Sequence, residues 1–475
     1  MKTLLINPYV SQEAIYGKSS EGIGAILPPL GIFYLASYLR QKGKGEIELL
    51  DACALKLSPE EVISFIQEKS FECVGLSATT LGYPYALEIA LLLRKQLPKT
   101  IILLGGAHAQ GDADAILEKQ EGIFDYICYG EGEFAFESLY DFLNGSTKKS
   151  EIKGWKYKEN GKIVTTPQAE IPENLDIFGH PVEVVPPELF PLYKEKVMAY
   201  KKLPIFSVMS SRGCPFQCTF CSTPEKFRNL YKKKVRYHSI EWICEELRLL
   251  QEKFGVQEII FVDDTFNLDK NRVIQFCEEK IRKELEIIWT CNFEANILSR
   301  QMLEKMKEAG CWGIMVGGES GSDTVLRFIK KGVTKAQLLE VGKLANELSI
   351  CSRVSFILGL PSDTEETILE TIEFVKKANF HLPYFQLYVP LPGTKMYEQL
   401  KEYGEVVNAD PKTMSASSIN YLPQGVSKEF LLKTYGKAHK EVYLRLPFIL
   451  MHLRFIRSFD DIKRYIKALK ALMDV

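Results

Sequence analysis

The sequence predicts an α/β protein of two or three domains: a Rossmann-like domain with a flavodoxin-like strand order, followed by a partial (β/α)6 barrel and a helical C-terminal segment. First, short unbroken apolar runs alternate with stretches of helical periodicity, which is typical of a parallel sheet covered on both faces. Second, this rhythm breaks once and then restarts for six more units. Third, 475 residues are too many for one ordinary domain, and 46% hydrophobic residues suffice for a large core.

The first domain spans residues 1–145 and contains five apolar runs that predict strands. We place the strands at 2–7, 46–51, 72–78, 100–106 and 125–130, and helices at 29–43, 59–69, 83–96, 112–120 and 132–143. In the flavodoxin-like order 2-1-3-4-5, strands one and three are neighbours. A ligand then binds outside their carboxyl ends.

Residues 146–198 predict a linker with a small hairpin. An Asn-Gly pair at 160–161 lies between strand-like flanks, which indicates a tight turn. The Pro-rich stretch PVEVVPPELFP at 181–191 does not favour a helix.

The second domain spans residues 199–400, where six strand patterns alternate with five helical patterns. We place its strands at 205–211, 258–264, 286–292, 312–318, 353–359 and 384–390, and helices at 239–254, 269–284, 299–309, 335–349 and 364–378. In β/α barrels the chemistry lies at the carboxyl ends of the strands. Each predicted strand is followed by polar or Gly-rich residues, in agreement with that rule.

Residues 401–475 predict a helical C-terminal domain. Its last stretch, LRLPFILMHLRFIRSFDDIKRYIKALKALMDV, alternates aliphatic and cationic residues. This pattern fits an amphipathic cap on the barrel, which base rates favour, or an interfacial helix in peripheral contact with a membrane.

Charge and cysteine usage limit the classes of partner. The formal net charge of −1 indicates no general attraction to nucleic acid. We see no signal peptide and no apolar stretch of 18 residues, so we expect a cytoplasmic protein with reduced thiols. Cys73, Cys128 and Cys291 lie within apolar runs and are expected to be core residues.

The stretch SSRGCPFQCTFCS at 210–222 is the strongest chemical motif. It contains Cys214, Cys218 and Cys221 with the spacing C-x3-C-x2-C. Thiolates are the ligands that select iron–sulfur clusters. Zinc usually takes four protein ligands, and the nearest histidine, His238, lies 17 residues beyond the last cysteine, so a zinc site is the weaker interpretation.

With Phe220 before its third cysteine, this motif resembles that of the radical S-adenosylmethionine (SAM) enzymes. The resemblance implies that the three cysteines bind a [4Fe–4S] cluster and take part in catalysis. SAM would chelate the fourth iron, and its reductive cleavage would give a 5′-deoxyadenosyl radical. An electron donor such as flavodoxin or ferredoxin is implied.

Later strand ends strengthen the resemblance. Asp263 and Asp264 in FVDDTF stand where the family carries Gly-Gly-Glu, and a carboxylate there can pair with the amino group of SAM. Glu319 and Ser320 in GGESGS fall in a region that contacts the ribose and methionyl groups in the family. A helix N-cap and first turn would explain the same two residues. VSFILGLPSDTEET and FQLYVPLPGTKMYE resemble the fifth- and sixth-strand elements of the family.

Small and hydroxyl residues follow the strands of the first domain and suit the close approach of a large cofactor. The residues of these strand ends that we predict to contact the cofactor are Asn7, Ser77, Thr79, Gly105, Gly106, His108, Glu131 and Gly132. Together with the barrel they resemble the cobalamin-dependent radical SAM family, through PPLGIFYLASYLRQKG, GLSATT, GGAHA, YGEGE and PLPGTKMY. That resemblance covers roughly residues 1–400 and implies a cobalamin-binding first domain.

One departure concerns the cobalt ligand. Many cobalamin domains carry Asp-x-His-x-x-Gly, whereas residues 51–56 read DACALK, with Cys53 in the position of the histidine. We therefore expect cobalamin to bind without a lower protein histidine. His108 either contacts the cofactor tail or is a structural loop residue.

The resemblance implies a methyltransferase acting on an unactivated carbon, or a phosphinate phosphorus, of a small-molecule or lipid-like intermediate. An oxidative cyclase or rearrangement enzyme has the same motifs. A methylthiotransferase would need three more cluster cysteines, for which Cys53, Cys73 and Cys128 are the candidates. A cobalamin-binding sensor with a degenerate barrel is the alternative outside catalysis.

Overall fold

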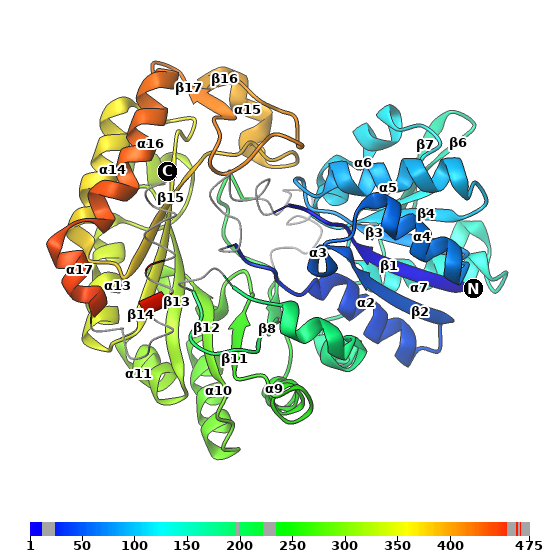
Figure 1. Cartoon of the computed structure of the whole chain (residues 1–475), viewed down its shortest axis with the longest axis horizontal. Coiled ribbons are helices and arrows are strands. Elements are labelled where there is room, and N and C mark those ends of the chain that lie inside the picture. Colours follow the sequence, from blue (N-terminus) through cyan, green and yellow to red (C-terminus); the bar gives the residue numbers. More distant parts are fainter. Residues whose placement is uncertain (12–23, 196–198, 222–233, 454–461, 464–465, 467–475) are drawn as a thin grey trace.

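The computed structural model describes residues 1–11, 24–195, 199–221, 234–453, 462–463 and 466. The chain forms two lobes that lie side by side, an N-terminal lobe drawn in blue and cyan and a larger C-terminal lobe drawn in green to orange (Figure 1).

The N-terminal lobe is built on a parallel sheet in the order β2-β1-β3-β4-β5, which confirms the predicted flavodoxin-like order. The strands are β1 (Lys2–Asn7), β2 (Glu46–Asp51), β3 (Cys73–Ser77), β4 (Ile101–Gly105) and β5 (Tyr126–Cys128). The helices are α2 (Leu30–Gln41), α3 (Ala52–Leu55), α4 (Pro59–Lys69), α5 (Tyr83–Gln96), α6 (Ala107–Lys119) and α7 (Gly132–Leu143). Helix α6 begins at Ala107, earlier than predicted, and the chain kinks at Asp112 (φ −136°).

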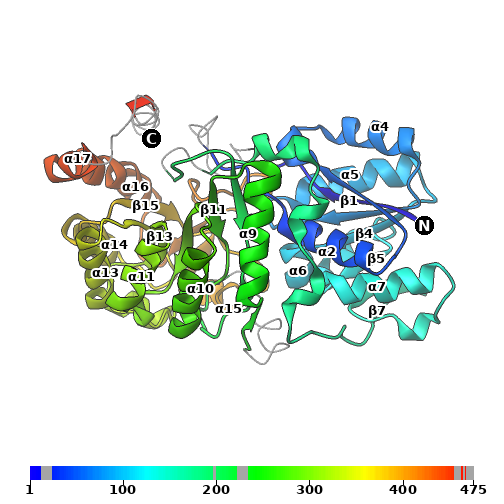
Figure 2. The same ribbon diagram turned by 90° about the horizontal axis from the view of Figure 1, so that it is seen from below.

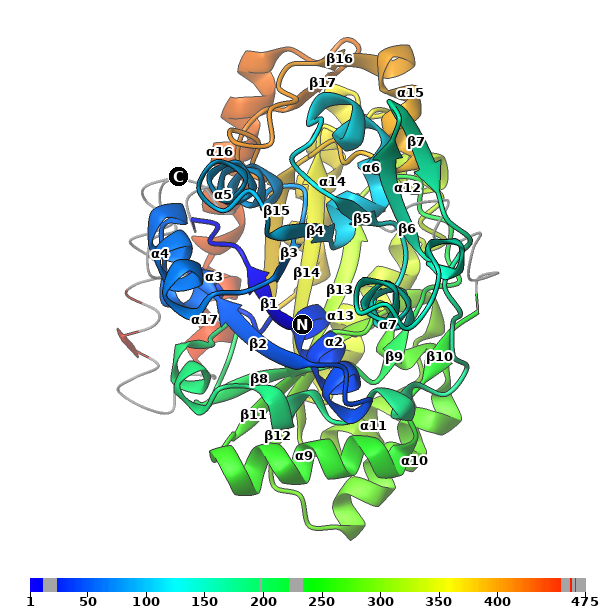
Figure 3. The same ribbon diagram turned by 90° about the vertical axis from the view of Figure 1, so that its right-hand side faces the viewer.

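The predicted hairpin is part of this sheet. β6 (Trp155–Glu159) pairs antiparallel with β5, and β7 (Lys162–Thr165) pairs with β6, so the two strands extend the sheet at the edge opposite β2 (Figure 3). Asn160 and Gly161 both have positive φ, as a tight two-residue turn requires.

The Pro-rich segment that follows lies between the lobes as a packed layer (Figure 2). Its three short 3-10 helices are η3 (Leu175–Phe178), η4 (Pro181–Val184) and η5 (Pro187–Leu192). η3 and η4 contact α2, and η4 also contacts α9 of the other lobe. Tyr193 at the end of the layer donates a 3.0 Å hydrogen bond to the buried carboxylate of Asp51. This part of the predicted linker is therefore integral to the core.

The C-terminal lobe contains a parallel sheet in the order β8-β11-β12-β13-β14-β15, so each strand pairs with the next along the chain, as in the predicted partial barrel. The strands are β8 (Ile205–Val208), β11 (Glu258–Phe261), β12 (Ile288–Phe293), β13 (Cys311–Glu319), β14 (Cys351–Leu358) and β15 (Leu382–Leu387). The helices α9 (Ile240–Phe254), α10 (Lys270–Arg282), α11 (Arg300–Glu308), α13 (Lys335–Glu347) and α14 (Glu365–Ala378) lie outside it.

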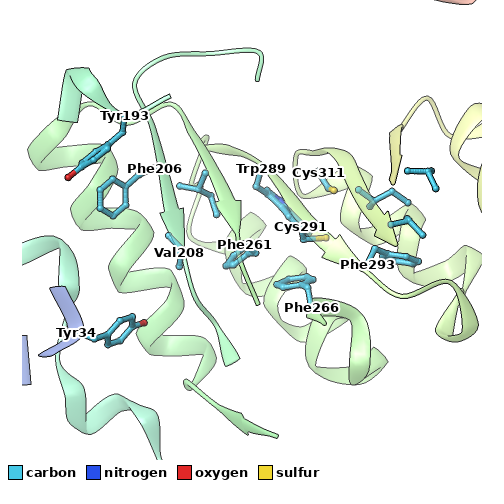
Figure 4. Packing of buried hydrophobic residues seen from close by; sticks show 14 of the residues in the cluster. Tyr34, Tyr193, Phe206, Val208, Phe261, Phe266, Trp289, Cys291, Phe293 and Cys311 are labelled. Carbon is cyan, nitrogen blue, oxygen red and sulfur yellow. The ribbon is translucent and has the colours of Figure 1, made fainter. Parts of the chain in front are cut away.

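One continuous hydrophobic core joins the barrel, the Pro-rich layer and one face of the N-terminal sheet. The rings of Phe261, Phe266 and Trp289 pack together, and the ring of Tyr193 packs edge-on against that of Phe206 (Figure 4). Because this core crosses between the lobes, the two lobes are packed against each other and are not joined by a flexible linker alone.

The C-terminal segment contains α15 (Lys395–Tyr403), α16 (Lys428–Tyr443) and α17 (Leu446–Leu453), together with an antiparallel pair, β16 (Gly404–Val406) and β17 (Tyr421–Pro423), that was not predicted. α16 packs on α14 and β15. Most of the predicted amphipathic stretch beyond residue 453 lies outside the described residues. Among the residues that are described, no helix is long and apolar enough to cross a membrane.

We expect Tyr193→Phe to lower the free energy of unfolding by about 1 kcal/mol or more, because the change removes one hydrogen bond to a buried carboxylate. Urea titration followed by circular dichroism measures the effect. Tyr85→Phe on α5 is the control, since that ring packs edge-on against Tyr9 within the N-terminal lobe and takes no part in the Pro-rich layer. An equal, small effect of both changes would contradict the structural role of the layer.

Candidate functional site

The predicted cluster cysteines lie on a loop at the carboxyl end of the first barrel strand. After β8 the chain forms a two-residue strand, β9 (Ser211–Arg212), and then the loop. The N–H of Thr219 donates to the carbonyl of Ile329 (3.0 Å), and its carbonyl accepts from the N–H of Met396 (2.9 Å). Segments after the fourth and sixth strands therefore hold the loop that carries Cys214, Cys218 and Cys221.

The three thiols fit the donor set of an iron–sulfur cluster. Cys218 is buried and the other two are partly exposed. Burial raises the pKa of Cys214, and that of Cys218 to about 12, which favours the neutral form of these two thiols in the absence of a metal. Among the described residues, no three Cys, His, Asp or Glu side chains converge as ligands of one metal ion. A four-iron cluster is larger than one ion and takes ligands that lie further apart.

Asp263 and Asp264 have different environments. Asp263 is buried and accepts hydrogen bonds of 2.6 Å from the Ser210 N–H and from the hydroxyls of Ser210 and Ser211. Asp264 is exposed at the barrel mouth, next to the loop: it accepts from the N–H of Gly213, and its charge acts on Cys214. Desolvation of the carboxylate by the surrounding protein, together with the charge of Asp263, raises the pKa of Asp264. Of the two carboxylates, Asp264 is the one available to a ligand.

Glu319 belongs to a buried ion cluster that was not foreseen. Lys331 Nζ lies 3.0 Å from Glu294 Oε2 and 3.6 Å from Glu319 Oε1, and all three side chains are buried. Burial disfavours the Lys331 cation, but the two carboxylates outweigh it and raise its pKa. Lys331 and both carboxylates act electrostatically on Cys218, so the cluster lies beside the cysteine loop. In the sequence, the only local indication of this ion cluster is the pair of basic residues 330–331 downstream of GGESGS.

Ser320 is used within the fold. Its hydroxyl lies 3.2 Å from that of Thr371 and accepts from the N–H of Ser322, which precedes α12 (Asp323–Phe328). The residue is buried. The alternative in which Glu319 and Ser320 form a helix N-cap and first turn is wrong in detail, because Glu319 ends β13 and the N-cap of α12 is Ser322.

A second site lies at the carboxyl ends of β1 and β3 in the N-terminal lobe. A cavity of about 180 Å³ opens there, at the predicted switch point of the sheet. Asn7, Ser77, Thr79 and Gly106 of the predicted residues line it, together with Pro8, Val10, Pro29 and Leu30 among others. One wall is thus the start of α2.

Gly106 shows why a glycine is needed at this edge. Its φ of +92° is a conformation that side-chain-bearing residues rarely adopt, and a Cβ atom would meet the carbonyl oxygen of Ala78 at 2.6 Å. Gly105 has no such restriction, because its Cβ would find only Cys128 at an ordinary 3.9 Å.

Cys53 occupies the sequence position at which many cobalamin domains carry the histidine that ligates cobalt from below. Cys53 lies on α3, and its Sγ is 3.9 Å from the carbonyl oxygen of Val10. Burial raises its pKa, which favours the neutral thiol. The neighbouring Asp51 accepts from Asn7 Nδ2 (2.8 Å), so Asn7 is oriented by the same strand end that begins α3.

His108 is buried behind the cavity. Its ring centre lies 4.3 Å from that of Tyr83, and burial lowers its pKa to about 4, so it is neutral. Its Nδ1 has no hydrogen-bond partner among the described residues. The packing on Tyr83 is what a structural histidine would show.

Glu131 and Gly132 lie at the start of α7, and Glu131 contacts the other lobe. Glu131 is the N-cap residue of the helix and pairs with Arg236 of the barrel lobe. A Cβ atom on Gly132 would meet Leu35 of α2 at an ordinary 3.8 Å. The lobes also meet at α6, where a Cβ on Gly111 would lie 2.9 Å from the carbonyl oxygen of Pro392, within the PLPGTKMY motif.

Known families match both lobes. The model described as the radical SAM superfamily matches residues 208–375, and the B12 binding domain model matches residues 21–140. The chain is 32% identical over 469 residues to an uncharacterised methyltransferase of Pyrococcus horikoshii, covering 99% of this chain and 98% of that protein. It is 26% identical over 400 residues to the anaerobic magnesium-protoporphyrin IX monomethyl ester cyclase of Cereibacter sphaeroides, covering 82% of this chain and 63% of that protein.

Two solved structures share the fold. OxsB, a cobalamin-dependent SAM radical enzyme solved with aqua-cobalamin and SAM, superposes with a TM-score of 0.73 at 19% identity, covering 98% of this chain and 70% of that chain. TsrM from Kitasatospora setae, a radical SAM methyltransferase solved with cobalamin and a [4Fe–4S] cluster, gives a TM-score of 0.69 at 16% identity, covering 99% of both chains.

We expect Gly106→Ala to weaken cobalamin binding by about tenfold or more, because the new Cβ must displace the backbone after β3. Absorbance titration with cobalamin measures the affinity. Gly105→Ala is the matched control and should have a much smaller effect. Equal affinities of the two variants would contradict the role of the loop.

Proposed function

The chain belongs to the cobalamin-dependent radical SAM enzymes, and on that premise we propose that it is a methyltransferase acting on an unactivated carbon, or a phosphinate phosphorus, of a small-molecule or lipid-like intermediate. The observation that carries the proposal is the similarity over nearly the whole of both chains to a protein described as a methyltransferase. A [4Fe–4S] cluster, SAM and cobalamin are the cofactors of this enzyme class.

When bound, the cofactors supply a 5′-deoxyadenosyl radical and a transferable methyl group. The chain holds them at two strand edges, one in each lobe. We assign the cluster to Cys214, Cys218 and Cys221, and the cobalamin contacts to the cavity lined by Asn7, Ser77, Thr79 and Gly106. An electron donor such as flavodoxin or ferredoxin completes the system.

The contacts to SAM are best provided by groups that remain available beside the cluster loop. SAM carries a cationic amino group, a carboxylate and ribose hydroxyls. Asp264 offers an exposed carboxylate, and Lys331 with Glu294 and Glu319 offers one cation and two acceptors. Glu294 Oε1 has no hydrogen-bond partner among the described residues, as expected of an acceptor kept for a ligand.

An oxidative cyclase is the second candidate, favoured by the similarity to the monomethyl ester cyclase. It uses the same two domains, so the two candidates differ in the fate of the methyl group. A methylthiotransferase is a poor fit, because Cys73 and Cys128 are buried in strands and burial raises the pKa of both thiols.

We expect the anaerobically reconstituted enzyme to transfer deuterium from methyl-deuterated SAM into its product. Mass spectrometry of product and 5′-deoxyadenosine measures both halves of the reaction. Formation of 5′-deoxyadenosine with the true substrate but without a deuterated product would refute methyl transfer and support the cyclase.

We expect Lys331→Met to weaken SAM binding by about tenfold or more, because it leaves two buried carboxylates without their cation. Equilibrium binding of SAM to the reconstituted protein measures this, and cobalamin affinity should not change. Lys330→Met is the matched control, since Lys330 is exposed. Native-like SAM binding by Lys331→Met would rule out the ion cluster as a binding element.

A further inference from the structure

Two arginines of the barrel lobe lie side by side just ahead of the cluster loop. Arg212 on β9 is directly opposite Arg236 on β10 (Arg236–Tyr237) in a short antiparallel ladder. Like charges in directly opposed positions repel each other. Both side chains are buried or nearly so, which makes this arrangement costly unless anions compensate it.

The compensating anions come from the other lobe. Arg212 donates to Glu133 Oε1 at 2.7 Å and lies 3.5 Å from Glu131 Oε2, while Arg236 donates to both oxygens of Glu131. The two carboxylates occupy the N-cap and the first turn of α7, where the helix dipole favours negative charge. Burial disfavours the Arg212 cation, but Glu133 and Glu131 outweigh it and raise its pKa.

Aromatic packing confines the same arginine. The guanidinium of Arg212 lies 4.8 Å from the ring centre of Tyr34 and 4.7 Å from that of Phe178. The hydroxyl of Tyr34, on α2, is in turn 3.0 Å from His238 Nε2 of the barrel lobe. Arg212 is thus held between residues of the N-terminal lobe and of the Pro-rich layer.

We infer that these two arginines and two glutamates form a clasp that sets the position of the cluster loop relative to the cobalamin edge, with Arg212 as its positioning residue. Only Gly213 separates Arg212 from Cys214. On the other side, Glu131 and Glu133 follow β5, which pairs with β4, the strand that ends at Gly105. A change in the clasp therefore reaches the cluster loop through one intervening residue, and the cobalamin edge through the pairing of β5 with β4.

The inference rests on the presence of both cofactors and not on methyl transfer, so it holds for a cyclase as well. It predicts that loss of the clasp leaves each cofactor bound but alters the geometry between them. The magnetic interaction between the reduced cluster and Co(II) cobalamin depends steeply on their separation and orientation, and it requires no substrate.

The test compares Arg212→Gln with the native holoenzyme. We expect the iron content and the cobalamin occupancy to be unchanged. In the electron paramagnetic resonance spectrum, we expect the dipolar interaction between the reduced cluster and Co(II) cobalamin to be weaker, or spread over a broader range of values. Backbone amides of α7 should exchange hydrogen about tenfold faster than in the native protein, or faster still. Arg248→Gln on α9 is the control, because Arg248 pairs with Glu245 in an exposed position and takes no part in the clasp, and it should be native-like in both measurements.

Native-like spectra and native-like exchange in Arg212→Gln would overturn the inference. If Arg212→Gln does not fold, the same two measurements are made on Glu133→Gln. Native-like spectra and native-like exchange in that variant would also overturn the inference. Methyl transfer that fails in every variant, while the spectra follow these expectations, would refute the proposed function and leave the clasp standing.

Discussion

The carboxylate of Asp263 accepts three hydrogen bonds of 2.6 Å from Ser210 and Ser211, and this buried contact sets the direction in which the chain leaves the first barrel strand. Burial raises the pKa of Asp263, although the serines and Arg272 favour its charged form. Arg272 also donates to the carbonyls of Ser210 and His238. One buried carboxylate therefore organises both the approach to the predicted cluster cysteines and, through Arg272, His238 at the junction of the lobes.

The two proposed cofactor sites follow the same rule of parallel sheets. Each lies where the carboxyl ends of strands leave backbone groups and polar loops available, and the Pro-rich layer packs one lobe against the other. Because a continuous core crosses this layer, the separation between the sites is set by packed side chains and by charges that must be paired. A radical reaction that uses both cofactors depends on such a fixed separation.

The elements themselves were predictable from local pattern. Apolar runs such as KTLLIN and helix caps such as Ser58 with Glu61 specify strands and helices without reference to the rest of the chain. The differences arise where a distant partner decides. The hairpin at 155–165 extends the N-terminal sheet because β5 otherwise has an open edge, and α6 begins early because the N–H of His108 donates to the carbonyl of Ala78.

By itself the sequence determined the fold class, the strand order and the three thiols, since periodicity and ligand spacing are local properties. Only the tertiary structure decided which charges meet. Asp263 anchors the chain whereas Asp264 faces the barrel mouth, Lys331 joins Glu294 and Glu319, and Glu131 pairs with an arginine of the other lobe. Residues 105 positions apart, such as Glu131 and Arg236, share no local signal, because their contact follows from packing two separately formed sheets together.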